Sequence, residues 1–113
     1  MSDEDLQPFH LMQHNDGSAS LMLTDFDEGA DIFEEFGLDA GGYAWHGVAD
    51  ALVRNRAKHL RRKLQYDPEA SMFVAYSKDG AALRELAALL RQALREPALL
   101  REAIEAADPD LMD

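Results

Sequence analysis

The sequence predicts an α+β fold, in which two β-hairpins form an antiparallel sheet that packs with about four helices in the chain order ββααββαα. The hairpins are predicted because two pairs of apolar segments are each interrupted by a turn signal, Asn15-Asp16-Gly17 in one and Asp67-Pro68-Glu69 in the other. The helices are predicted because apolar residues elsewhere recur at the i, i+3, i+4, i+7 spacing of one helix face.

The first hairpin is formed by residues 8–14 and 18–25. The second of these segments alternates, so that one face, formed by Ala19, Leu21 and Leu23, is expected to lie on the core while the other stays partly wet.

Two helices are predicted between the hairpins. The spacing of Gly29, Ile32, Phe33 and Phe36 predicts a short first helix, and Gly37 is placed where a C-terminal cap belongs. After Gly41-Gly42 a second apolar stripe begins, which fades near residue 60; its members are Trp45, Val48, Ala49, Leu52 and Val53.

The second hairpin is formed by residues 62–67 and 70–77, and the run 72–76 is apolar on both faces, as expected of a central strand. A long helix is predicted from about Gly80, with Leu83, Leu86, Ala87, Leu90 and Leu94 on its apolar face. Pro97 opens a last short helix over residues 98–107, at the N1 position that proline tolerates.

The chain has 113 residues, which is enough for one domain of the common size of about 100–150 residues. We expect residues 1–7 to be a disordered acidic tail and residues 8–113 to form that domain. The absence of cysteine excludes disulfides and thiolate metal sites, and no apolar run is long enough to cross a membrane. No secretory signal follows the acidic N-terminus, so we expect a cytoplasmic location.

Charge is distributed unevenly along the chain, whose formal net charge is −11. Residues 1–53 contain twelve Asp or Glu and no Lys or Arg, whereas residues 54–113 contain ten acidic and eleven basic side chains. Six of these bases fall within residues 54–63. We therefore expect an electrically dipolar molecule, an asymmetry that bears on partners and association rates rather than on the fold.

No segment has the ligand pattern of a metal or cofactor site. Residues 25–31 resemble a calcium-binding loop, but Gly29 is at position 5 rather than 6, and Phe36 occupies the position of the final bidentate glutamate. His10 and His14 lie four residues apart on a predicted strand, which separates them by about 13 Å, too far to share one ion. We therefore expect no metal and no cofactor.

Motifs of nucleophilic catalysis and of phosphate binding are also missing. The sequence contains no G-x-S-x-G, Walker or G-x-G-x-x-G motif, and the serines have no signature base beside them. Its carboxylates lie on a predicted polar helix face, whereas a general acid needs burial to titrate near neutral pH. The sequence therefore predicts a protein that is not an enzyme.

A regulatory or nucleic-acid-associated role is the alternative that the sequence leaves open. The segment RNRAKHLRRK, residues 54–63, has the local composition of a phosphate-contacting surface. A net charge of −11 repels a polyanion, however, and the same bases suit the exposed end of the second helix. We therefore favour protein binding over nucleic-acid binding.

Two segments together resemble a known family. GGYAWHGVADAL (residues 41–52) and QYDPEASMFVAYSKD (residues 65–79) are similar to the pattern of the immunity protein 51 family of bacterial polymorphic toxin systems. The resemblance extends to the first hairpin and to the helix after residue 79, so it covers most of the chain beyond residue 7. Its pattern rests on Tyr43, Trp45, Asp67, Pro68, Glu69, Phe73 and Tyr76.

This resemblance implies a small cytoplasmic α+β protein that binds and neutralises a cognate toxin domain, without catalysis and without a cofactor. It names neither the toxin nor an oligomeric state. The residues themselves add that an acidic protein suits a basic partner, because complementary charge raises association rates. We therefore hypothesise that a basic toxin domain binds an acidic face formed by Glu28, Asp31, Glu34, Glu35 and Asp39.

The residues around the only tryptophan could form a binding loop or an ordinary helix start. Gly41-Gly42 most simply break the chain between two helices, and Trp45 shares an apolar stripe with Val48 and Leu52. We therefore predict that Trp45 is buried, that His46 points off the stripe to the surface, and that the motif residues are mainly structural.

Overall fold

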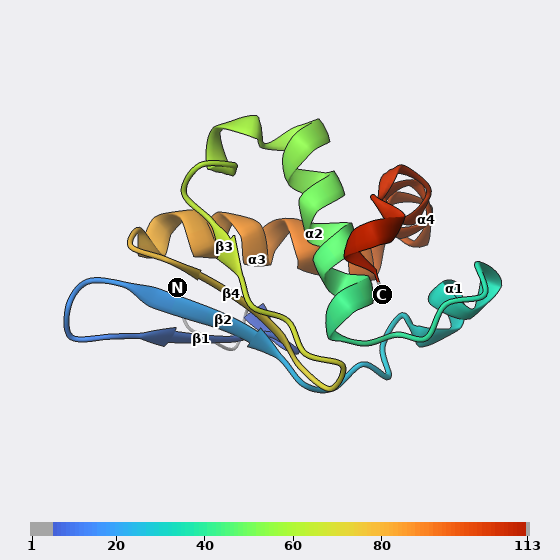
Figure 1. Cartoon of the computed structure of the whole chain (residues 1–113), viewed down its shortest axis with the longest axis horizontal. Coiled ribbons are helices and arrows are strands. Elements are labelled where there is room, and N and C mark those ends of the chain that lie inside the picture. The colour runs from blue at the N-terminus through green and yellow to red at the C-terminus, as the bar shows by residue number, and fades with distance from the viewer. Residues whose placement is uncertain (1–5, 113) are drawn as a thin grey trace.

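The computed structural model describes residues 6–112, and its elements follow the predicted order ββααββαα (Figure 1). The strands are β1 (His10–Gln13), β2 (Ala19–Leu23), β3 (Gln65–Tyr66) and β4 (Phe73–Ser77). The helices are α1 (Ala30–Glu35), α2 (Gly42–Arg56), α3 (Gly80–Arg95) and α4 (Pro97–Ala106), with 3₁₀ turns at Lys58–Leu60 and Pro109–Leu111. The predicted α+β fold class is confirmed.

The four strands form one antiparallel sheet in the order β1-β2-β4-β3. Helices α2 and α3 lie over one face of this sheet, and α4 packs against both of these helices (Figure 1). The alternation predicted for the second strand is confirmed, because every second residue of β2 is buried. The buried apolar residues of the four strands are Leu11, Ala19, Leu21, Leu23, Phe73 and Ala75.

No helix of the described residues covers the opposite face of the sheet. The register places Met12, Ser20 and Tyr76 in one row on this face, where Met12 is 49% and Tyr76 40% exposed. The apolar residues that β4 carries on this outer face are less covered than those on the inner face, since Val74 is half-buried and Tyr76 is exposed. β4 is an inner strand, as predicted, but the helices pack on one side of it only.

Trp45 is fully buried, as predicted, and lies among the largest side chains of the core. Its ring packs edge-on against Phe9 and Phe33, with centroid distances of 5.9 and 5.4 Å. Leu6 is also buried, so packing starts before residue 8, where the domain was expected to begin. The rest of the predicted acidic tail, residues 1–5, lies outside the described residues.

The ends of α1 and α2 differ in how well the sequence anticipates them. Gly37, with φ 73°, ends α1 in the left-handed conformation, and the N–H of Leu38 donates to the carbonyl of Phe33 at 3.0 Å, as a Schellman cap requires. α2, by contrast, ends at Arg56 although its apolar stripe continues further. Ala57 leaves the helical conformation with φ −149° and ψ 53°.

Candidate functional site

The five acidic residues expected to bind a partner lie at one end of the molecule, opposite the β1–β2 turn (Figure 1). α1 is amphipathic, and its buried residues Ile32 and Phe33 turn the polar side outwards. We call the five residues the acidic surface, and all of them are exposed: Glu28, Asp31, Glu34, Glu35 and Asp39.

Glu35 differs from the other four residues because it has a cationic partner. Arg101 on α4 donates from Nε and Nη2 to the two carboxylate oxygens of Glu35 at 2.9 and 3.0 Å. This hydrogen bonding lowers the pKa of Glu35 and raises the pKa of Arg101. No sequence signal links the two residues, which are 66 positions apart and meet only because α1 packs on α4.

The remaining four residues of the acidic surface form no ion pair among residues 6–112. Beside Asp39 is a hollow of 360 Å³, which the chain between α1 and α2 forms together with Tyr43, Ala70 and Met112. Tyr43 is 37% exposed there. An aromatic side chain of the family pattern thus lies next to the acidic surface. The positions of these residues in the sequence did not predict that they lie close together.

Gly41 and Gly42 pack directly against the turn between β3 and β4. The N–H of Gly42 donates to the carbonyl of Ala70 at 3.3 Å. A Cβ on Gly42 would lie 1.8 Å from the carbonyl oxygen of Glu69, and one on Gly41 would lie 2.8 Å from that of Ala70. Only glycine permits this approach of two backbones. The two segments that carry the family resemblance are therefore pressed together in the fold.

The seven residues of the family pattern differ in burial. Trp45 and Phe73 are fully buried, and Pro68 is half-buried in the turn. The turn is held by its backbone, since Glu69 and Met72 exchange hydrogen bonds of 2.7 and 3.1 Å. Burial explains the two core residues, but it does not explain the exposed members Tyr43, Asp67, Glu69 and Tyr76.

The prediction that His46 is a surface residue is wrong, because its side chain is half-buried. Its ring lies against that of Tyr66, with the ring centroids 4.7 Å apart. Burial lowers the pKa of His46, and the nearby carboxylate of Asp50 partly opposes that change. His46 points off the apolar stripe of α2, as expected, but β3 lies against that side of the helix.

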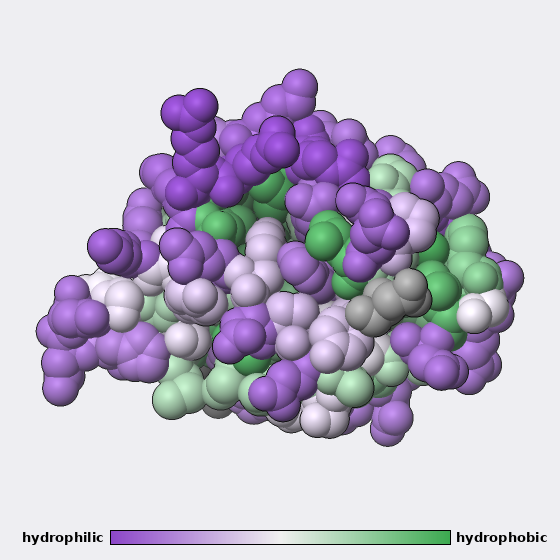
Figure 2. Space-filling model, viewed as in Figure 1, coloured by the Kyte–Doolittle hydropathy of each residue, from purple (hydrophilic) through white to green (hydrophobic). Residues whose placement is uncertain are grey.

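The basic segment, residues 54–63, lies between α2 and β3, and Figure 2 shows strongly hydrophilic side chains over this region at the top of the view. Lys58, Arg61 and Arg62 are exposed and form no ion pair within the described part of the chain. Its other cations are paired: Arg54 with Asp50 at 2.8 Å, Arg56 with Glu102 at 3.8 Å and Lys63 with Asp79 at 3.4 Å.

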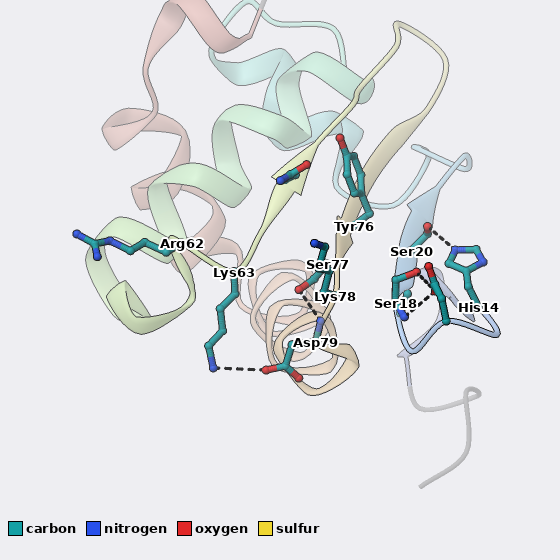
Figure 3. Close-up of a pocket in the computed structure, with 12 residues that line it drawn as sticks. His14, Ser18, Ser20, Arg62, Lys63, Tyr76, Ser77, Lys78 and Asp79 are labelled. Carbon is teal, nitrogen blue, oxygen red and sulfur yellow. Dashed lines mark hydrogen bonds and ion pairs between the residues drawn. The ribbon is translucent and has the colours of Figure 1, made fainter.

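A cleft of 590 Å³ lies at one end of the sheet, between the β1–β2 turn, the chain that leads into β3 and the start of α3 (Figure 3). Its cations are Arg62, Lys63 and Lys78, and its carboxylates are Asp16 and Asp79. No sequence signal indicates this cleft, because its residues come from three separate segments.

No group of three or more His, Asp or Glu side chains among residues 6–112 comes close enough together to hold a metal ion. His10 and His14 both lie on the first hairpin, and His14 contacts the hydroxyl of Ser20 at 3.0 Å. None of the helices in this range is long and apolar enough to cross a membrane.

Comparison with known proteins gives one match. The model of a family described as immunity protein 51 matches residues 9–109. This range includes both glycines of the α2 start, the β3–β4 turn and the whole acidic surface. No curated protein and no solved structure matches the chain significantly.

Proposed function

The chain belongs to the immunity protein 51 family, and from this membership we propose that it binds and neutralises a cognate bacterial toxin domain. The proposed mode of action is a stoichiometric complex rather than catalysis. It operates in the cytoplasm of the producing cell, through the acidic surface, on a basic face of the toxin.

The main support for the acidic surface as the binding site is its negative charge. Four exposed carboxylates lie on or beside α1 without an ion-pair partner among residues 6–112, and residues 1–53 contain no Lys or Arg. Two like charges 4 Å apart repel by about 1 kcal/mol even in water. Binding a basic partner relieves such repulsion, so the cluster fits a docking site better than it fits a stabilising feature of the free protein.

Tyr43 and the hollow beside Asp39 support the same surface. Protein interfaces draw much of their affinity from a few aromatic anchors surrounded by polar groups. Tyr43 is 37% exposed, and it lies next to the acidic surface. We propose that the carboxylates guide the toxin to the surface and that Tyr43 contributes to holding it there.

The test measures association with the toxin domain encoded beside this gene, by stopped-flow at low and at physiological salt. Asp31→Lys combined with Glu34→Lys should lower the association rate roughly tenfold and weaken its salt dependence. Glu35 is left intact, because reversing its charge would place two cations together at Arg101. Glu85→Lys, on α3, is the control away from α1; it reverses one charge rather than two and also removes the contact of Glu85 with His59.

The possible results separate the two parts of the proposal. A complex that forms at the wild-type rate in Asp31→Lys/Glu34→Lys contradicts the acidic surface and leaves the immunity function standing. A toxin domain that neither co-purifies with the chain nor loses activity in its presence contradicts the function. The nucleic-acid alternative predicts instead a gel shift by the chain alone, weakening as salt is raised.

A further inference from the structure

Two hollows share one lining residue, Arg62. The first is the 590 Å³ cleft at the end of the sheet. The second measures 580 Å³, and no carboxylate lines it. Its lining consists of cationic, imidazole and amide side chains: Arg54, Asn55, Lys58, His59, Arg61 and Arg62.

This concentration of cations is unfavourable in the free protein. Like charges 4 Å apart cost about 1 kcal/mol even in water, and Lys58, Arg61 and Arg62 have no carboxylate partner among the described residues to offset that cost. A hollow whose lining holds several cations and no carboxylate of residues 6–112 is complementary to an anion.

The cleft side of Arg62 supplies further donors. Figure 3 shows Arg62 and Lys63 on one side of the cleft, with His14 and Ser20 on the other. Tyr76, which is 40% exposed, also lines the cleft and offers both a ring face and a hydroxyl. The site therefore combines cations with neutral hydrogen-bonding groups, as sites for phosphate-bearing molecules commonly do.

The two carboxylates of the cleft already accept hydrogen bonds from the protein. Asp16 accepts from the N–H and the hydroxyl of Ser18 at 3.0 and 2.6 Å. Asp79 accepts from the N–H of Ala81 at 3.0 Å, which caps α3, and from Lys63. Both are held by turn and cap geometry, which gives them a structural role, and neither forms an ion pair with Arg62.

We propose that a small phosphate-bearing molecule binds where the two hollows meet, with its phosphate against Arg62 and the neighbouring Lys58 and Arg61. A phosphate has several acceptor oxygens and can accept from more than one cation at once, whereas guanidinium forks match its geometry.

The charge of the whole chain favours a small ligand over a nucleic acid. Salt screens charges beyond about 8 Å at physiological ionic strength, and α1, which carries three residues of the acidic surface, lies apart from the chain between α2 and β3 (Figure 1). A small anion therefore senses mainly the side chains near Arg62, where the carboxylates of Asp50, Asp79, Glu85 and Glu102 are each paired with another side chain. A long polyanion would also approach the acidic part of a chain whose net charge is −11.

The experiment is isothermal titration calorimetry of the full chain with sodium pyrophosphate and, separately, with adenosine monophosphate. Pyrophosphate should bind, and more weakly as salt is raised. Arg62→Gln should weaken that binding about tenfold, because a charge-assisted hydrogen bond is lost. Tighter binding of adenosine monophosphate than of pyrophosphate would identify a nucleotide as the source of the phosphate. Equal binding of the two probes would identify a free phosphate as the ligand.

Arg95→Gln provides the matched control, since it removes the same charge from the last turn of α3, about 24 Å along the helix from Asp79. It should leave pyrophosphate binding unchanged. Three results would overturn the proposal: no binding of either probe at millimolar concentration, equal affinity in Arg62→Gln, or equal loss in both variants. Binding of a DNA oligonucleotide in preference to both probes would overturn it in favour of a nucleic-acid surface.

Discussion

The segments on either side of Gly41 differ in the exposure of their side chains. Residues 28–39 expose the carboxylates of the acidic surface to solvent, whereas in α2 nine residues, Trp45 among them, are buried. Exposed charges contribute little to folding, while buried aromatic and backbone contacts contribute much. The exposed carboxylates of residues 28–39 can therefore be substituted without loss of the fold, whereas the buried residues of α2 cannot.

The largest effect should come from Trp45→Ala, measured by chemical denaturation. Loss of this fully buried ring should lower the free energy of unfolding by about 3–5 kcal/mol. Trp45→Phe should cost less, because it keeps an aromatic ring and removes an indole N–H that has no hydrogen-bond partner among residues 6–112. A loss below about 1 kcal/mol in Trp45→Ala would contradict its place in the core.

Gly42→Ala tests the contact between α2 and the β3–β4 turn. The new Cβ would lie 1.8 Å from a backbone carbonyl, so one backbone must move, at a cost of about 1–3 kcal/mol or more. Gly80→Ala is the control, since its Cβ would meet nothing closer than 4.0 Å. That variant should be neutral or slightly stabilising by thermal unfolding. Equal effects of the two substitutions would mean that the contact does not restrict the chain.

A smaller effect is expected from the titration of His46. Its pKa is lowered in the fold, so the unfolded chain binds more protons as pH falls below the unfolded value of about 6.5. The stability associated with neutral His46 is present above that pH and is lost as pH falls through the folded pKa. Denaturation of His46→Gln across this range should show a shallower decline than the wild type. An identical decline would show that His46 does not contribute.

The smallest effect on stability should come from Asp31→Lys, which changes the acidic surface without touching the core. Its free energy of unfolding should move by only tenths of a kcal/mol, since exposed charges interact weakly. A loss of unfolding free energy as large as that of Gly42→Ala would contradict the distinction between the two segments. Wild-type stability together with slower toxin association would support it.

Local patterns predicted several elements well. The alternation of Ala19, Leu21 and Leu23 indicated the buried face of β2, and Gly37 ends α1 as expected. Such features depend on contacts within a few residues, which periodicity and turn chemistry report directly. The burial of Trp45 was predictable for the same reason, because it shares one helix face with other apolar residues.

Contacts between distant segments could not be predicted in this way. The pairing of Glu35 with Arg101 and the stacking of His46 on Tyr66 join elements whose mutual approach is set by packing. The exposure of Tyr76 likewise depends on which face of the sheet the helices cover. The residues of one segment do not indicate which other segment will pack against them.

The fold class, the order of the elements, the burial of Trp45 and the separation of acidic from basic charge along the chain could all be predicted from the sequence. Three features became visible only in the folded chain: Gly41 and Gly42 press against the β3–β4 turn, Tyr43 lies beside the acidic surface, and Arg62 lines two hollows. The two groups of features differ in the range of the interactions that produce them. Periodicity and charge distribution depend on residues that are near one another in the sequence. Close packing depends on contacts between segments that meet only when the chain folds.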